Sequence, residues 1–309
     1  MPLVSIIVPM YNAERFVQQA LSSIIQEQSV SLEIIVVNDK STDNSLSKVT
    51  AVDDPRIRII DGPGKGIAAC FNAGLAASRG EIIMRCDADD IYPHDRIRHQ
   101  VRWLDDHADY GALCGGFTAI DPKGQHLSIL TEKRQPEEIS AELNQGITRT
   151  HFCTFAVRAS TLKELKMREF FTTAEDIDLQ LRLAEKCRIW FESKVYYHYR
   201  LHDLSITHSQ PNAERIFFEH TAREFQEQRQ KFGSDDLEKG VPPSPTQENG
   251  NENDTTQAAS HIQRILLGEA WRKHAEGKKL ESIKIGYRSL RSKPSSMKTW
   301  KSFFALLLK

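Results

Sequence analysis

The densest group of chemically useful side chains in this 309-residue sequence is the run RCDADD, which ends at Asp90. Asp87 and Asp89 come just after residues 81–85 (EIIMR), whose apolar centre is typical of a buried strand. In extended backbone, residues two apart point the same way about 7 Å apart, so both carboxylates can face one ligand. Paired carboxylates repel each other unless a cation lies between them, and their hard oxygens suit Mg²⁺ or Mn²⁺ bound to phosphates. A solvated acidic turn is the alternative interpretation.

A second acidic pair, Asp39 and Asp43, lies in the run VNDKSTD, after the apolar residues 32–37. A carboxylate at the end of such a strand can accept hydrogen bonds from a base N–H or a ribose hydroxyl. We therefore expect Asp39 to contact a ligand. Asp43 has a competing role, because Ser41 or Thr42 can cap the next helix and an acidic residue is favourable in its first turn.

Two further groups of polar side chains come later in the sequence. Glu175 and Asp176 stand at the start of an expected helix, residues 176–186. They either stabilise the helix dipole, or supply a general base that takes a proton from an acceptor hydroxyl. Arg200 and His202 follow the last expected strand, where a cationic or metal-binding group can help to hold a diphosphate.

The glycine-rich run GPGKG at residues 62–66 excludes two common nucleotide sites. It does not have the GxGxxG pattern after a first strand, which a dinucleotide site requires, and it does not have the GxxxxGK[ST] pattern of a P-loop. Lys65 can approach a phosphate from this position. A plain tight turn is the alternative.

These side chains need a scaffold, and the first part of the chain predicts one. Apolar, β-branched runs alternate with helical patterns and predict strands at 4–8, 32–37, 56–60 and 81–85. Strand, helix and strand within residues 4–37 form a βαβ crossover, which makes the strands parallel. Ligands of doubly wound sheets bind beyond the carboxyl ends of the strands. The acidic groups fall at those ends.

The later sequence predicts a mixed second half and an extension. We expect a helix at 94–107, strands near 112–117 and 152–157, the helix at 176–186 and a strand pair around 189–202. Residues 234–256 contain three prolines and almost no apolar side chains, which predicts a disordered linker. Basic helices are expected at 258–275 and 278–291. The predicted domains are therefore 1–233, the linker 234–256, and a tail, 257–309.

Composition excludes several classes of protein. The net charge of −1 argues against nucleic acid as a partner, and no run of about 18 apolar residues is present to span a membrane. The start of the sequence has the pattern of a strand rather than of a signal peptide. The five cysteines form no CxxC pair, which argues against a disulfide scaffold or a thiolate zinc site. We expect a cytoplasmic protein.

Charge is divided unevenly along the chain. Residues 257–309 contain 12 Lys and Arg against 3 Asp and Glu, whereas residues 1–256 contain 29 against 39. The basic tail also carries Trp300, Phe303, Phe304 and a run of leucines, so it can lie on the cytoplasmic face of an anionic membrane. Packing against the acidic remainder of the chain is the alternative.

The order of these motifs resembles family 2 glycosyltransferases of the GT-A fold. The resemblance rests on SIIVPMYNAE, VNDKSTD, NAGLAASRGEII leading into DADD, EDIDL and the final HxxS, and it covers residues 3–210. It implies an α/β fold with a Rossmann-like, mixed but mainly parallel sheet flanked by helices, followed here by the C-terminal helical extension. It also implies an inverting hexosyltransferase that uses a nucleotide sugar.

The resemblance implies a role for individual residues. Asp176 would be the catalytic base, with Glu175 beside it on the acceptor side. A divalent cation, Mn²⁺ or Mg²⁺, would bind Asp87, Asp89 and His202. The nucleotide sugar would contact Pro9, Tyr11, Asp39, Asp43, Lys65, Asn72, Asp87 and Arg200.

The resemblance also sets the expected partners. The family most commonly uses UDP-sugars, which are the expected donor, and GDP- or dTDP-sugars are the alternatives. The expected acceptor is a cell-surface polysaccharide or a lipid-linked glycan precursor. Phe71 departs from the family, because many relatives have a basic residue there. A non-catalytic nucleotide-sugar-binding or scaffold protein is one alternative function. A nucleotidyltransferase is another, but residues 9–15 lack the Gly-rich, basic loop that a triphosphate needs.

Overall fold

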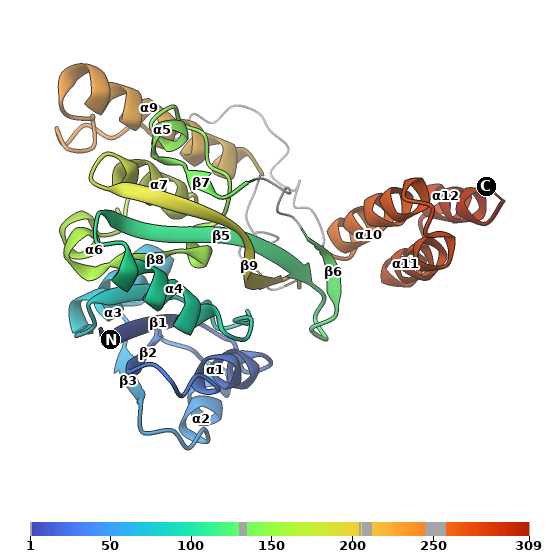
Figure 1. Cartoon of the computed structure of the whole chain (residues 1–309), viewed down its shortest axis with the longest axis horizontal. Coiled ribbons are helices and arrows are strands. Elements are labelled where there is room, and N and C mark those ends of the chain that lie inside the picture. Colours follow the sequence, from blue (N-terminus) through green and yellow to red (C-terminus); the bar gives the residue numbers. More distant parts are fainter. Residues whose placement is uncertain (1, 130–134, 204, 206–211, 245–257, 309) are drawn as a thin grey trace. The chain divides into compact units, whose positions relative to one another are not determined.

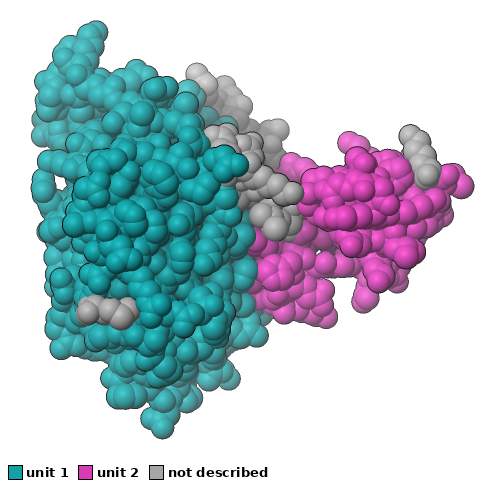
Figure 2. All heavy atoms as spheres, viewed as in Figure 1, with its two compact units in different colours: residues 1–117, 131–198, 213–248 teal, residues 118–130, 199–212, 249–309 magenta. Residues whose placement is uncertain are grey.

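The computed structural model describes residues 2–129, 135–203, 205, 212–244 and 258–308 (Figure 1). The chain divides into two compact units, which Figure 2 colours separately. The first unit comprises residues 1–117, 131–198 and 213–248, and the second comprises 118–130, 199–212 and 249–309. Each unit has a hydrophobic core of its own.

Four parallel strands form the N-terminal part of the sheet, in the order β3-β2-β1-β4. Every residue of β1, β2 and β4 is buried, as expected for apolar strands covered on both faces. The elements are β1 (Val4–Met10), α1 (Val17–Ile25), β2 (Leu32–Asn38), α2 (Ser45–Thr50), β3 (Ile57–Asp61), α3 (Ile67–Ala77) and β4 (Ile82–Arg85). The predicted parallel arrangement is confirmed.

The rest of the sheet is antiparallel, which makes the whole sheet mixed. Its order continues from β4 through β8, β5 and β9 to β7, and β6 pairs with β5. The elements are α4 (Arg96–Asp106), β5 (Tyr110–Ile120), β6 (His126–Ile129), β7 (Glu137–Glu138), α5 (Ser140–Leu143), β8 (Ala156–Arg158), α6 (Ala159–Leu165), α7 (Glu175–Ala184) and β9 (Arg188–Arg200).

Two strand predictions in this half are wrong. Instead of a strand pair at 189–202 there is one long strand, β9. The strand expected near 152–157 begins only at Ala156, because Phe152–Thr154 form a 3₁₀ turn. The aromatic rings there pack into the core instead of extending the strand: Phe152 lies edge-on to Phe71 and stacks on Phe155.

Helix α9 (Asn212–Phe232) was not predicted, although its apolar residues have helical spacing. Phe218 and Phe225 are buried and contact Phe171, which precedes α7. Burial of aromatic side chains at this junction therefore attaches α9 to the core of the first unit.

The turn after α9 falls within the predicted linker, 234–256. Asp235 is fully buried and accepts hydrogen bonds from Arg168 and Arg229, both at 2.6 Å, and Leu237 packs on the main core. Residues 245–257 lie outside the described residues. The limits of the linker and of the tail stay predictions.

We expect Asp235→Ala to lower the free energy of unfolding by about 3 kcal/mol, because it leaves two largely buried guanidinium groups without their shared carboxylate. Asp236→Ala is the matched control. Asp236 is 43 % exposed in its ion pair with Lys239, so its loss should cost less than about 1 kcal/mol. Urea denaturation measures both, and equal values would show that Asp235 does not tie this turn to the core.

The second unit contains three helices, α10 (Ala258–Ala275), α11 (Lys279–Ser292) and α12 (Met297–Leu308). Ile262 and Leu266 of α10 pack with Leu127 of β6 in its core. The helices expected at 258–275 and 278–291 are confirmed, and α12 adds a third. Within the described residues, no helix is both long and apolar enough to cross a membrane.

Candidate active site

The predicted ligand groups of the N-terminal half gather at one edge of the sheet. Because β1 to β4 are parallel, the loops that follow them leave from the same edge (Figure 1). These loops carry Tyr11, Asp39, Lys65, Asp87 and Asp89. Tyr11 is 63 % exposed, and Asp87 and Asp89 are half-buried.

Arg85 connects this edge to the acidic start of α7. It is the last residue of β4 and is buried, and its Nε lies 2.6 Å from Asp87 Oδ1 while its Nη1 lies 3.2 Å from Glu175 Oε1. Burial disfavours its charge, but the charges of Asp87 and Glu175 outweigh burial and raise the pKa of Arg85 well above its ordinary value. Asp87 and Glu175, which are 88 residues apart in the sequence, therefore share one guanidinium.

Sequence reasoning missed Arg85. The sequence contained one signal that could have found it: Arg85 directly follows the apolar run IIM, which predicts buried neighbours. The structure confirms that residues 82–84 are buried. A buried cation is costly unless it is paired, so such a residue indicates acidic partners. The sequence does not show which of the many carboxylates those partners are.

The carboxylate of Asp87 is already engaged within the protein, which limits what it can offer a cation. The carboxylate of Asp87 is used by Arg85, which donates to both of its oxygens, and its backbone N–H donates to the hydroxyl of Tyr197. Among the described residues, no group of three or more His, Cys, Asp and Glu side chains can hold a metal ion. Mg²⁺-like ions are commonly held by only one or two carboxylates together with substrate phosphates. The donor set fits a cation that arrives with a diphosphate.

Glu175 and Asp176 open α7 and have opposite electrostatic surroundings. Burial raises the pKa of Glu175 to about 6, with a further contribution from the charge of Asp176, and Arg85 opposes it. Burial also opposes ionisation of Asp176. The interaction of the Asp176 carboxylate with His151 outweighs burial, and the pKa of Asp176 is therefore lowered. Asp176 Oδ2 lies 3.8 Å from His151 Nδ1 and accepts a hydrogen bond from the backbone of Phe152. Asp176 is thus held ionised.

Asp39 shapes the glycine-rich turn. Its two carboxylate oxygens accept hydrogen bonds from the backbone N–H groups of Gly64 and Gly66, at 2.6 and 3.1 Å. Both glycines have positive φ, of 71° and 88°, a conformation that favours glycine. Gly62 has no room for a side chain, since a Cβ there would lie 2.6 Å from Asp39 Oδ1. Lys65 projects from this turn and is exposed.

Asp43 and Asn72 make hydrogen bonds within the protein. Asp43 accepts from Glu14 N and from the N–H and hydroxyl of Ser45, the first residue of α2. The capping alternative is wrong in its details, because α2 begins after Asn44, so that neither Ser41 nor Thr42 caps it and Asp43 precedes its first turn. Asn72 exchanges two hydrogen bonds with the backbone of Met167, at 2.8 and 2.9 Å. Both side chains hold loops in place, and their predicted contacts with the nucleotide sugar lack support from this geometry.

The three remaining predicted site residues are Pro9, Arg200 and His202. Pro9 is a buried residue within β1, paired with β2. Arg200 and His202 belong to the second unit and are buried there. The guanidinium of Arg200 donates to the carbonyl oxygens of residues 121 and 122. The roles of Arg200 and His202 toward a diphosphate or a cation stay predictions.

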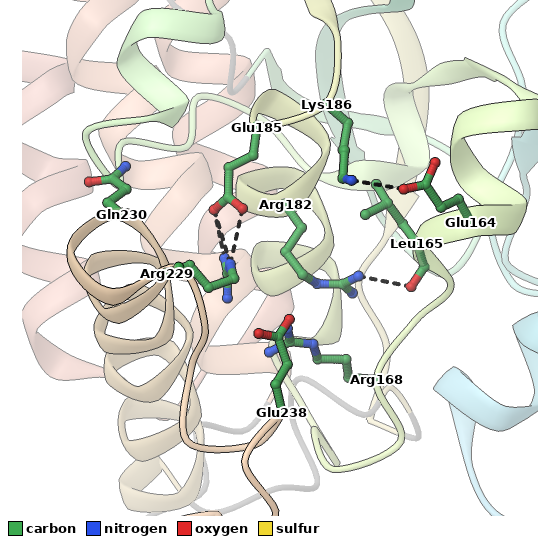
Figure 3. Close-up of a pocket in the computed structure, with 10 residues that line it drawn as sticks. Glu164, Leu165, Arg168, Arg182, Glu185, Lys186, Arg229, Gln230 and Glu238 are labelled. Atoms are coloured by element: carbon green, nitrogen blue, oxygen red, sulfur yellow. Dashed lines mark hydrogen bonds and ion pairs between the residues drawn. The ribbon is translucent and has the colours of Figure 1, made fainter.

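A cavity of about 550 Å³ lies at the other end of α7 (Figure 3). It is lined mainly by charged side chains, and its three arginines are paired: Arg182 with Asp178, Arg168 with Asp235 and Glu238, and Arg229 with Glu185 and Asp235. The last residue of the helix, Ala184, lies about 12 Å along the helix axis from Asp176 at 1.5 Å per residue. The walls of this cavity are therefore held together by a network of ion pairs that supports the fold. The cavity is separate from the edge of the sheet that carries Asp89.

The comparisons with known proteins agree with this geometry. Residues 5–166 match the profile of glycosyl transferase family 2. The chain is 29% identical over 203 residues to the chondroitin synthase of Pasteurella multocida, which covers 65% of this chain and 21% of that protein. It therefore spans about a fifth of the length of this relative.

Two solved structures share the fold. TarS of S. aureus in complex with UDP-GlcNAc superposes with a TM-score of 0.61, at 18% identity, over 94% of this chain and 81% of that chain. The mannosyltransferase PcManGT of Pyrobaculum calidifontis, in complex with GDP-Man and Mn²⁺, gives 0.53 at 19% identity, over 99% and 85%. The fold is thus of the GT-A type.

The sheet is mixed: β1 to β4 are parallel, whereas the pairings of β6, β7 and β8 are antiparallel, so the expectation of a mainly parallel sheet is wrong. The chain belongs to glycosyl transferase family 2. The predictions of the family, of an α/β fold of the GT-A type and of the enzyme class are confirmed.

Proposed function

We propose that this enzyme transfers a sugar from a nucleoside diphosphate sugar, with UDP as the expected nucleotide, to an acceptor hydroxyl. The observation that carries the proposal is the guanidinium of Arg85, which joins the DADD loop to Glu175 next to the ionised Asp176. Donor-side and acceptor-side carboxylates are thereby held in one network. The complexes of TarS with UDP-GlcNAc and of PcManGT with GDP-Man support a nucleotide-sugar donor.

In the proposed reaction, Asp176 is the general base. Its lowered pKa keeps it ionised at neutral pH, ready to take the proton from the acceptor hydroxyl. The acceptor oxygen then bonds to the anomeric carbon while the bond from that carbon to the diphosphate oxygen breaks. A single displacement of this kind inverts the anomeric configuration. His151 and Phe152 N hold the base in place.

Asp89 is the proposed protein ligand for a divalent cation, with Asp87 beside it in its ion pair with Arg85. When bound, the cation stabilises the charge that develops on the diphosphate leaving group. PcManGT was solved with Mn²⁺ and GDP-Man, which supports Mn²⁺ as one candidate, and Mg²⁺ is the other.

The acceptor is proposed to be a growing polysaccharide or a lipid-linked glycan precursor. Two relatives from Pasteurella multocida are named chondroitin synthase and hyaluronan synthase, and their names support a glycan acceptor. The sugar-nucleotide class can be tested before the acceptor is known, because water can take the place of the acceptor hydroxyl as the nucleophile and release the nucleoside diphosphate.

The test is release of nucleoside diphosphate from a set of donors, with and without Mn²⁺. We expect release from one nucleotide class, UDP-sugars, dependent on the cation and lost in Asp89→Ala. Glu164→Gln, a 62 % exposed surface change, is the control and should not alter the rate. The proposal would be contradicted if the folded protein released nucleoside diphosphate from none of the donors, whether or not candidate acceptors were present.

The rate should fall on acidification through about pH 6 because Glu175 becomes protonated there and loses its ion pair with Arg85. Asp176 remains ionised through this range since its pKa is lowered. In Glu175→Gln we therefore expect a lower plateau and no acid limb near pH 6, measured as kcat/KM against pH. A limb that persists unchanged near pH 6 in this variant would assign it to another group.

A further inference from the structure

Helix α12 exposes its most apolar face. The outward side chains recur at helical spacing of three and four, and their exposed fractions are 71, 38, 53, 39 and 87 % for Met297, Trp300, Phe304, Leu307 and Leu308. The buried residues of the same helix are Thr299 and Leu306. A helix that only packed into its own unit would place its apolar side chains inward. We call the five exposed residues the α12 stripe.

The orientation of α12 is fixed by contacts inside the second unit. Gly286 of α11 makes room for Phe303 and Leu306, since a Cβ there would lie 3.0 and 3.1 Å from them. On the same side, Trp271 Nε1 of α10 donates to Ser302 Oγ at 2.7 Å. These contacts account for the inward face, so the stripe must face outward.

The stripe is ordered as well as exposed. The rings of Trp300 and Phe304 lie 5.9 Å apart, and Trp300 Nε1 donates to the carbonyl of Pro294 at 2.9 Å. A tryptophan whose N–H is already satisfied can place its ring in an apolar phase at lower cost. The aromatic part of the stripe is therefore organised before anything binds it.

Cationic side chains accompany the stripe. Lys298 and Lys301 lie on α12, which contains no acidic residue, and Lys284 and Arg291 are exposed on α11 beside Tyr287. Two of the three acidic residues in 257–309 already have basic partners within 258–278: Glu269 pairs with Arg272, and Glu276 with Arg272, Lys273 and Lys278. The surface around the stripe is thus strongly positive.

We propose that the α12 stripe and the exposed cations of α11 and α12 form a docking surface for an anionic lipid bilayer. Aromatic and aliphatic side chains flanked by lysine and arginine are the composition of helices that lie in a membrane interface. A soluble polyanion would use the cations but not the stripe. A second copy of this chain would bring the same positive charge against this surface.

The test is flotation of the full chain with vesicles of phosphatidylcholine alone or mixed with phosphatidylglycerol. We expect binding to the anionic vesicles and a decrease at high salt, because lysine and arginine attract the anionic surface through screened interactions. Trp300→Ser/Phe304→Ser should reduce vesicle affinity by about tenfold or more, and Lys298→Gln/Lys301→Gln by a similar factor.

The matched control is Leu46→Ser/Ile147→Ser, which removes two side chains that are 44 and 49 % exposed in the first unit. Circular dichroism checks that each variant keeps its helices, and light scattering without vesicles reports self-association. Failure of the wild-type chain to float, or equal flotation of the stripe and control variants, would overturn the proposal. The proposal would also be overturned if the stripe substitutions only converted a dimer into a monomer. In that case a second copy of this chain, and not a bilayer, would cover the stripe.

Discussion

Replacing Asp176 by Asn is expected to lower kcat by about 10² to 10⁴-fold and to leave donor binding nearly unchanged. The amide keeps the shape of the side chain and can still accept from Phe152 N, but it cannot take the proton of the acceptor hydroxyl. Such a loss in kcat alone is the signature of a group that acts in the transition state. Steady-state kinetics with the best donor measure it.

Two controls separate this effect from damage to the fold. Thermal unfolding should shift little in Asp176→Asn, because its side chain remains partly exposed. His151→Gln removes the contact that lowers the pKa of Asp176 but keeps the carboxylate, so we expect a smaller loss of kcat than in Asp176→Asn, with the acid limb near pH 6 still present because Glu175 is unchanged. Retention of more than about a tenth of the wild-type kcat in Asp176→Asn would rule out Asp176 as the base.

Replacing Arg85 by Met is expected to remove activity and to lower the free energy of unfolding by about 3 kcal/mol. The change leaves the carboxylates of Asp87 and Glu175 without their shared cation, and Glu175 is largely buried. Urea denaturation and kcat/KM measure the two effects. Arg85→Lys keeps the charge but cannot donate to both carboxylates at once, so it should recover stability only in part.

A double variant tests whether Arg85 acts through Glu175. In Arg85→Met/Glu175→Gln one of the stranded charges is gone, so part of the lost stability should return while activity stays low. Stability that is no better in the double variant than in Arg85→Met would show that the two side chains are not coupled. A folded, fully active Arg85→Met would contradict the proposed network.

The parallel part of the sheet was predictable because it depends on local patterns. Buried parallel strands are continuous apolar runs, and β1, β2 and β4 have such runs. The order of strand and helix then places the polar loops at one edge without further information. For that reason the sequence led to Asp39, Asp87 and Asp89 as residues of a common edge.

What could not be predicted depends on partners far apart in the sequence. Asn72 is polar and close to the site motifs, but its amide binds the backbone of Met167, 95 residues later. Arg85 has partners 2 and 90 residues away. Neither pairing leaves a periodic signal. The continuous course of β9 likewise depends on its neighbours in the sheet rather than on its own residues.

The C-terminal helices show the same limit. Their basic and aromatic composition left two hypotheses open, an anionic membrane surface and packing against the acidic remainder of the chain. The face that α12 turns outward follows from Gly286, whose missing side chain admits Phe303 and Leu306. A larger residue there would force α12 to pack differently. Sequence indicated the chemistry of this surface, and the packing identified its residues.

The central claim is that the carboxyl edge around Asp89 is the donor site, and calorimetric titration with UDP tests it most directly. The wild-type chain and Asp176→Asn should both bind UDP in the presence of Mn²⁺ and much more weakly without it, because Asp89 would hold the cation, which would offset the negative charge of the diphosphate. Asp89→Ala should lose this dependence on Mn²⁺ together with most of its affinity. Binding of UDP by Asp89→Ala with the wild-type affinity and the wild-type response to Mn²⁺ would contradict the claim.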